Sequence, residues 1–161
     1  MSGQSNKPDE GDMAPDFELP VTEKGVMSLS SLKGKPVVLF FYPKDDTSGC
    51  TKEAVEFTAA LPEFEKIGVA VLGISPDPLK KHDKFVEKHS LGMPLISDEE
   101  KTALNAYGVW VEKSMYGKKY MGVERSTFLI DADGKIAKAW RKVKVPGHVD
   151  EVLAAARRIV A

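Results

Sequence analysis

The run Pro36–Tyr42 constrains the fold of this chain most, because it is short, almost wholly apolar and soon followed by helix-forming sequence. Its β-branched and aromatic residues are typical of a buried central strand. Pro43 ends the strand, and Asp45–Gly49 has the composition of a loop. Thr51–Leu61 then predicts an amphipathic helix, which is expected to continue beyond Pro62 with a kink. A strand, a loop and a helix in this order predict an α/β fold.

The rest of the chain supplies further elements of the same kind. Val69–Ser75 is a second apolar run, and it predicts a strand parallel to the first with a right-handed crossover. Other predicted strands are Val26–Leu29, Pro94–Ser97, Ser126–Ile130 and Ile136–Trp140, the last two forming a hairpin, and other predicted helices are Pro78–Lys88, Lys101–Tyr107 and Val149–Val160. These elements predict a central mixed β-sheet flanked by helices. Residues 1–12 are expected to be a flexible N-terminal extension, and residues 13–161 a single domain.

The composition excludes several classes of function. The formal net charge of −1 gives no excess of positive charge for nucleic-acid binding, and the basic stretch Lys138–Lys144 is predicted to be the solvated face of a strand. No apolar run approaches the roughly 20 residues that span a bilayer. The polar start of the chain lacks the apolar core of a signal peptide. We therefore expect a cytoplasmic protein that binds neither nucleic acid nor membrane.

Cys50, the single cysteine of the chain, stands where the central strand gives way to a helix. A thiolate is the reactive form of cysteine, and the free N–H groups of a first helical turn stabilise it. Thr47 lies three residues earlier, and Gly49 lets the backbone approach a ligand. The alternatives are a small buried apolar residue at Cys50 and a turn or capping hydroxyl at Thr47. The placement favours an ionised sulfur that solvent can reach.

The pattern Pro43-x-x-x-Thr47-x-x-Cys50 resembles the active-site motif of the peroxiredoxins, which are thiol-dependent peroxidases with a thioredoxin-like fold. The resemblance extends from Gly11–Phe17 through Arg125–Asp131 into the final helix. It therefore covers nearly all of the chain that is expected to be ordered.

Two further segments narrow the resemblance. Phe41–Thr47, and Gly73–Ser75 followed by Lys81 and His82, are similar to the bacterioferritin-comigratory, or Q-type, subgroup. The resemblance implies a thioredoxin-like domain that needs no metal or organic cofactor. It also implies a monomer or a weak dimer.

The resemblance implies a catalytic role for three residues. Cys50 would attack one peroxide oxygen and become a sulfenic acid. Thr47 would hydrogen-bond the peroxide, and Arg125 would contact both the thiolate and the substrate. Arg125, the Thr47 hydroxyl and the backbone N–H of Cys50 are the candidate donors for the charge that grows as the O–O bond breaks. For Arg125 the alternative is an ordinary surface arginine.

Three more residues would complete the site. The resemblance places Pro43 in the wall of the substrate pocket, where it shields the sulfur from water. Gly49 is the second substrate-binding position, because glycine lets the backbone approach a ligand. Glu53 matches an acidic position that orients the arginine in many members of the family. Its alternative is a solvent-exposed carboxylate in the first turn of a helix, where negative charge is favourable.

The chain departs from the Q-type pattern because it lacks a second, resolving cysteine. The two positions where members carry it are occupied by Val55 and, on the next helix, by a residue near Val86. Valine at position 55 suits a buried helix face. A natural one-cysteine enzyme and a replaced resolving residue both remain open. Either way, an outside thiol such as thioredoxin, glutaredoxin or glutathione is expected to reduce the oxidised Cys50.

The sequence leaves two other functions open and disfavours a metal site at the histidines. A redox sensor would pass a disulfide from oxidised Cys50 to a partner protein. A one-cysteine thiol transferase would instead use Cys50 for thiol–disulfide exchange. The absence of a Cys-x-x-Cys pair disfavours ordinary disulfide exchange. His82, His89 and His148 lack the spacing of metal ligands and are expected at the surface or at helix ends.

Overall fold

The computed structural model describes residues 7–22 and 25–160. The strands of this part of the chain are β1 (Glu18–Val21), β2 (Gly25–Ser28), β3 (Val37–Phe41), β4 (Ala70–Ser75), β5 (Leu95–Ser97), β6 (Trp110–Met115), β7 (Lys118–Val123), β8 (Ser126–Ile130) and β9 (Ile136–Trp140). Its helices are the 3-10 helix η1 (Ser30–Leu32) and the α-helices α1 (Ser48–Lys66), α2 (Leu79–His89), α3 (Thr102–Ala106) and α4 (His148–Val160).

Seven strands form one mixed sheet in the order β2-β1-β5-β4-β3-β8-β9. The buried run expected to be central is indeed near the middle, because β3 pairs in parallel with β4 and antiparallel with β8. The predicted parallel pair and the predicted hairpin of β8 and β9 are both confirmed. The sheet therefore has the mixed α/β architecture that the order of elements predicted.

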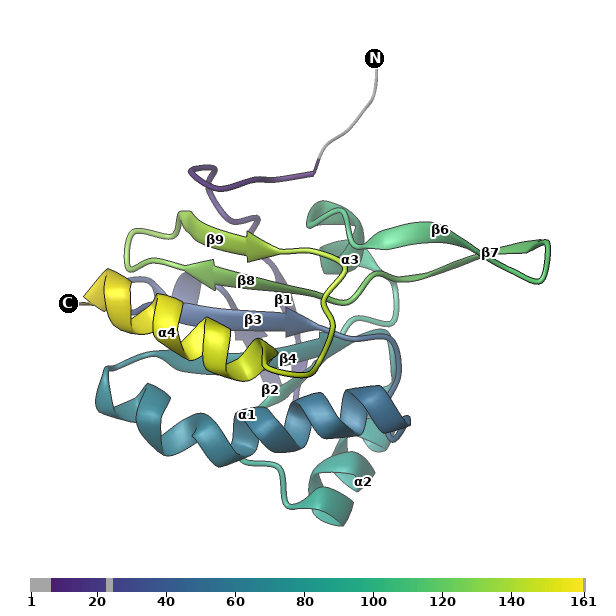
Figure 1. Ribbon diagram of the computed structural model, residues 1–161, viewed down its shortest axis with the longest axis horizontal. Coiled ribbons are helices and arrows are strands. Elements are labelled where there is room, and N and C mark those ends of the chain that lie inside the picture. Colours follow the sequence, from purple (N-terminus) through teal and green to yellow (C-terminus); the bar gives the residue numbers. More distant parts are fainter. Residues whose placement is uncertain (1–6, 23–24, 161) are drawn as a thin grey trace.

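The core has two layers, one on each face of the sheet. Side chains alternate along β3, so Val38 and Phe40 pack in one layer whereas Leu39 and Phe41 pack in the other. The first layer lies under α1 and α4, which cross the same face of the sheet (Figure 1). The second includes residues of α3 and of the N-terminal segment. Because both faces are covered, every residue of β3 is buried.

Helix α1 begins three residues earlier than predicted, at Ser48, and its buried face differs from the prediction. It continues past Pro62 to Lys66 as a single helix. Its buried residues are Cys50, Glu53, Ala54, Phe57 and Phe64. Val55 is 42% exposed, so the prediction that valine there suits a buried face is wrong. Packing of phenylalanines on both sides of Pro62 stabilises a helix whose local sequence would interrupt it.

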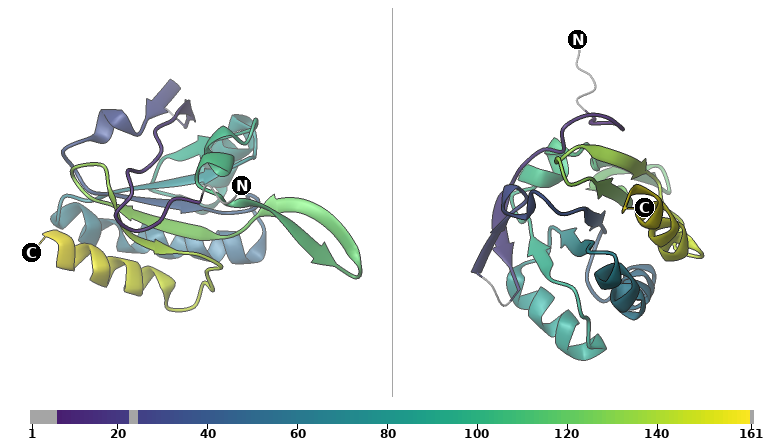
Figure 2. Two further views of the ribbon diagram at one scale, coloured as in Figure 1. Left: turned by 90° about the horizontal axis from the view of Figure 1, so that it is seen from above. Right: turned by 90° about the vertical axis from the view of Figure 1, so that its left-hand side faces the viewer.

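The sequence did not predict β1 or the hairpin of β6 and β7. The hairpin is a two-stranded sheet of its own and projects away from the body (Figure 2, left). Its turn is Tyr116-Gly117, and both residues have positive φ, 53° and 79°, as a two-residue hairpin turn requires. Trp110 and Val123 at the base of the hairpin pack against the core, but the rest of the two strands carries little apolar alternation. The exposed apolar side chains include Met115, Tyr120 and Met121.

The N-terminal extension is described only in part, because residues 1–6 lie outside the described residues. In the described part, the backbone N–H of Gly11 donates to the carbonyl of Ile136 at 2.8 Å, and Arg141 donates to the carbonyl of Pro8 at 2.8 Å. Met13 forms a bridge with Lys135. These contacts lie along the hairpin of β8 and β9. The division of the chain at residue 12 stays a prediction.

Candidate active site

Cys50 is the third residue of α1, at the end of the sheet where β3 leads into the helix (Figure 1). Thr47 is the N-cap residue, with extended backbone angles, and its carbonyl accepts the first helical hydrogen bond from Thr51 at 2.8 Å. The free N–H groups of this first turn give the sulfur's surroundings partial positive charge. Cys50 is only 2% exposed, so its sulfur is more enclosed than the sequence predicted.

Arg125 lies beside this sulfur, although it is 75 residues away in the sequence. It immediately precedes β8, whose first residue, Ser126, pairs with the last residue of β3. One guanidinium nitrogen, Nη2, donates to Sγ of Cys50 at 3.2 Å, and the other, Nη1, donates to Oε1 of Glu53 at 2.7 Å. The side chains of Arg125 and Glu53 are 16% and 0% exposed. The alternatives of a surface arginine and a solvent-exposed carboxylate are therefore wrong.

Gly49, Pro43 and Thr47 are the remaining predicted residues. A side chain at Gly49 would bring its Cβ within 3.3 Å of Nη2 of Arg125, so glycine leaves room for the guanidinium. Pro43 is half-buried and Thr47 is exposed. The Thr47 hydroxyl donates to the carbonyl of Lys44 at 2.8 Å. Its hydrogen is therefore committed, and the hydroxyl is placed to accept rather than to donate as the sequence predicted.

The pKa values of Arg125 and Glu53 each depend on the charge of the other. Burial alone lowers the pKa of Arg125, but the neighbouring charges of Glu53 and Cys50 outweigh it and raise that pKa above its usual value. Burial raises the pKa of Glu53 to about 7, although the charge and hydrogen bond of Arg125 oppose the change. Oε2 of Glu53 is buried and has no hydrogen-bond partner among the described residues. An unsatisfied carboxylate oxygen makes the ionised form of Glu53 costly to bury.

Glu53 is therefore expected to make folding stability depend on pH. Its pKa rises from 4.5 to about 7 on folding, so its contribution is fully present below pH 4.5 and is lost as the pH rises through 7. Relative to Glu53→Gln, which stays neutral, the wild type should lose about 3 kcal/mol of unfolding free energy between pH 4.5 and pH 9. Urea unfolding across this range, with both proteins carrying Cys50→Ser so that no thiol titrates, measures the difference. A constant difference at every pH would contradict this assignment.

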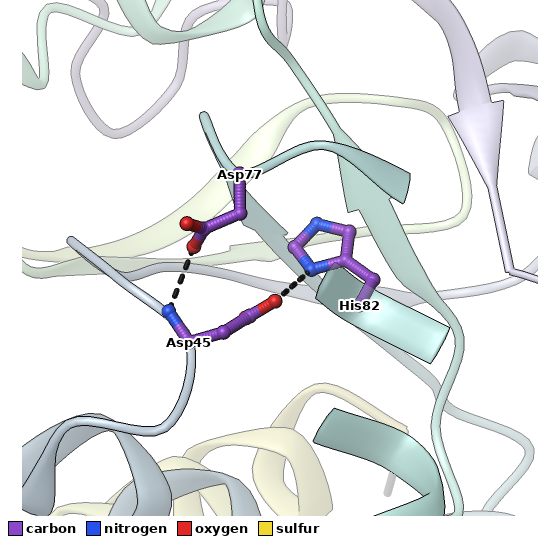
Figure 3. A group of neighbouring side chains, drawn as sticks. All are labelled: Asp45, Asp77 and His82. Atoms are coloured by element: carbon purple, nitrogen blue, oxygen red, sulfur yellow. Dashed lines mark hydrogen bonds and ion pairs between the residues drawn. The ribbon is translucent and has the colours of Figure 1, made fainter. Parts of the chain in front are cut away.

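A second polar group near the site was not predicted from the sequence. Asp45, Asp77 and His82 place three potential ligand atoms within 4.8 Å of one another (Figure 3). His82 is 0% exposed and His148 4% exposed, so the expectation that all three histidines lie at the surface or at helix ends is wrong for His82. His148 is the first residue of α4 but is buried. The spacing of His82 from the aspartates along the chain gave no signal of this cluster.

Comparison with known proteins identifies the family. A family model described as the AhpC/TSA family matches residues 10–139. The chain belongs to this family. The putative peroxiredoxin bcp of Coxiella burnetii is 53% identical over 143 residues, which are 89% of this chain and 95% of that protein. Peroxiredoxin Bcp of Bacillus subtilis is 49% identical, with 89% and 91% of the two chains covered.

Solved structures of the same group are similar to this protein. The bacterioferritin comigratory protein of Xanthomonas campestris matches with a TM-score of 0.89 and 43% identity, covering 95% of this chain and 100% of that one. A PrxQ variant of Xylella fastidiosa matches with a TM-score of 0.91 and 39% identity, covering 99% and 100%. The predicted thioredoxin-like peroxiredoxin fold is confirmed. This peroxiredoxin is a thiol peroxidase of the Bcp group, and its single cysteine makes it a one-cysteine form.

Proposed function

We propose that this peroxiredoxin reduces hydrogen peroxide and organic hydroperoxides at Cys50. The observation that carries the proposal is the 3.2 Å contact between Nη2 of Arg125 and Sγ of Cys50 at the start of α1. A guanidinium and a helix N-terminus together favour a thiolate and offer donors to an oxygen that gains negative charge. The Xanthomonas relative is described by its alkyl peroxide reduction activity, which supports hydroperoxides as substrates.

In the proposed oxidation, the Cys50 thiolate attacks the terminal oxygen of the peroxide. The O–O bond breaks, an S–O bond forms, and the leaving hydroxide or alkoxide takes a proton to become water or alcohol. Arg125 and the backbone N–H of Cys50 donate to the oxygens as the charge develops. Thr47 accepts a hydrogen bond from the peroxide O–H, because its own hydrogen is bonded to Lys44. Pro43 forms the wall of the pocket, and Gly49 lets the backbone approach the peroxide.

Regeneration requires two outside thiols. The first attacks the sulfenic acid, releases water and forms a mixed disulfide with Cys50. The second attacks this mixed disulfide, which frees the Cys50 thiol and leaves the two donors joined as a disulfide. We propose thioredoxin, glutaredoxin or glutathione as the donor.

The setting of the enzyme is also a proposal. We place it in the cytoplasm, where a reducing environment keeps a single cysteine as a free thiol, and as a monomer or weak dimer. No helix among residues 7–22 and 25–160 is long and apolar enough to cross a membrane.

Single-turnover oxidation tests this function. Stopped-flow mixing of the reduced protein with hydrogen peroxide or an alkyl hydroperoxide should give a rate constant at least about 1,000-fold above that of free cysteine, from fuller ionisation combined with donor stabilisation. Cys50→Ser should be inert. A rate constant near that of free cysteine would contradict the proposal and favour the sensor or transferase. Fast oxidation without re-reduction by any thiol in a panel would leave a sensor that acts once.

A further inference from the structure

The loop that carries Pro43 and Thr47 is attached to the protein body through Asp45, which lies between them and is 6% exposed. The Asp45 side chain points into the protein, toward His82 (Figure 3). Its Oδ2 lies 2.6 Å from Nδ1 of His82, and its Oδ1 accepts a hydrogen bond from the Tyr42 hydroxyl at 2.6 Å. Its backbone N–H donates to a carboxylate oxygen of Asp77 at 2.7 Å. One residue of the loop thus makes three buried hydrogen bonds.

His82 connects this residue to the sheet. Nε2 of His82 lies 2.9 Å from the carbonyl oxygen of Ile96 in β5. A carbonyl can only accept, so Nε2 carries a hydrogen and donates it. Nδ1 faces the Asp45 carboxyl, and one proton lies between the two groups. Because His82 is completely buried, water does not compete for either bond, and both are directional.

The same bonds account for the cluster of potential metal ligands. Both ring nitrogens of His82 are already engaged. Oδ2 of Asp77 accepts from the backbone N–H of Asp45 and from the Ser75 hydroxyl at 2.8 Å. The three residues therefore form a hydrogen-bonded network that connects the loop to the protein body.

The other side-chain attachments of the loop are weaker. Asp46 contacts Lys88 at 2.8 Å and His89 at 2.9 Å, but these are partly exposed ion pairs, which contribute little. The Thr47 hydroxyl bonds to Lys44, within the same loop. The backbone of Thr47 is held by α1, since its carbonyl accepts from Thr51 at 2.8 Å. The orientation of its hydroxyl depends instead on Lys44, the neighbour of Asp45.

We propose that His82 is a positioning residue for peroxide reduction: by holding the Asp45 carboxyl, it fixes Pro43 and Thr47 in the arrangement that receives the peroxide. His82 does not touch the substrate. The inference rests on the proposed function of Cys50 and extends it to the loop that precedes α1. A displacement of about 1 Å in such a group can cost on the order of 100-fold in rate.

Two substitutions separate the two bonds of His82. In His82→Asn the amide nitrogen takes the place of Nδ1 and can still donate to Asp45, whereas in His82→Gln it takes the place of Nε2 and reaches only toward Ile96. We expect H82Q to lower the rate constant of Cys50 oxidation by hydrogen peroxide about 10- to 100-fold, and H82N to retain it within about fivefold. His89→Gln is the matched control on the same helix, expected within about twofold of wild type.

Alkylation by iodoacetamide at the same pH is the second readout, because it requires the thiolate but not a positioned peroxide. We expect alkylation of Cys50 in H82Q to match wild type within about threefold while peroxide oxidation falls. Parallel loss of both reactions in H82Q would overturn the proposal, as would equal loss of peroxide oxidation in H82N and H82Q. Unchanged peroxide oxidation in folded H82Q would overturn it too.

Asp45→Asn keeps the test decisive if H82Q does not fold. A neutral amide holds His82 less strongly than a carboxylate does, so peroxide oxidation should fall about tenfold with alkylation unchanged. Unchanged oxidation in D45N would overturn the proposal. Slow oxidation of the wild type itself would instead refute the proposed function, so the two failures are distinguishable.

Discussion

Replacement of Arg125 by alanine is expected to lower the rate constant of Cys50 oxidation by hydrogen peroxide about 100- to 1,000-fold. Its Nη2 lies 3.2 Å from the sulfur and its Nη1 is fixed by Glu53, so the guanidinium is oriented before the peroxide arrives. Such a preorganised donor stabilises the charge on the leaving oxygen without reorganising at the moment of reaction. Stopped-flow oxidation over a range of pH measures the loss.

Ionisation of the thiol alone is too small to explain this effect. A free thiol with a pKa of about 8.5 is roughly 3% ionised at pH 7, so complete ionisation gains only about 30-fold. The deficit of Arg125→Ala should therefore persist at alkaline pH, where the sulfur is ionised in both proteins. Arg125→Lys, which keeps the charge but cannot bridge Glu53 and Cys50 with a fork, should be intermediate. If the deficit vanishes at alkaline pH, the arginine acts only through ionisation.

Replacement of Phe57 by alanine is expected to lower the unfolding free energy by about 3–5 kcal/mol. Phe57 lies on the buried face of α1 and is completely buried. Its ring stacks on Phe40 of β3 with the centroids 4.6 Å apart. It also packs against Phe64, 6.2 Å away. Removing this ring leaves a cavity between the helix that carries Cys50 and the sheet. Chemical unfolding followed by circular dichroism measures the change.

Val55→Ala is the matched control for Phe57→Ala. Val55 lies on the same helix, two residues before Phe57, but it is 42% exposed, so its truncation should change the unfolding free energy by no more than about 0.5 kcal/mol. Similar losses of unfolding free energy in the two variants would contradict the prediction that the buried face of α1 supplies its stabilising contacts.

The fold could be predicted where the sequence pattern reflects burial. β3 and β4 are continuous apolar runs because both faces of the sheet are covered, and this made them recognisable. The hairpin of β6 and β7 was missed because it packs against little and so carries no apolar periodicity. The continuation of α1 past Pro62 was predicted, but its start was placed three residues late because Ser48 and Gly49 are typical of a loop.

In the site, too, some residues could be predicted from local sequence and others could not. Cys50, Thr47 and Pro43 lie within one loop and the following helical turn, so a short motif could identify them. Arg125 reaches the sulfur only because β8 pairs with β3, and the sequence supported its role solely through the family resemblance. His82 meets Asp45 across 37 residues, and no spacing rule connects them.

The burial of Cys50 limits which reactants can contact its sulfur. With 2% of the residue exposed, Cys50 presents almost no surface to another folded protein. We therefore expect that regeneration by a protein thiol would require the first turn of α1 to loosen after oxidation, so that the two halves of the cycle would use different conformations. Cross-links that hold this turn shut would leave a molecule that consumes one peroxide and then stalls.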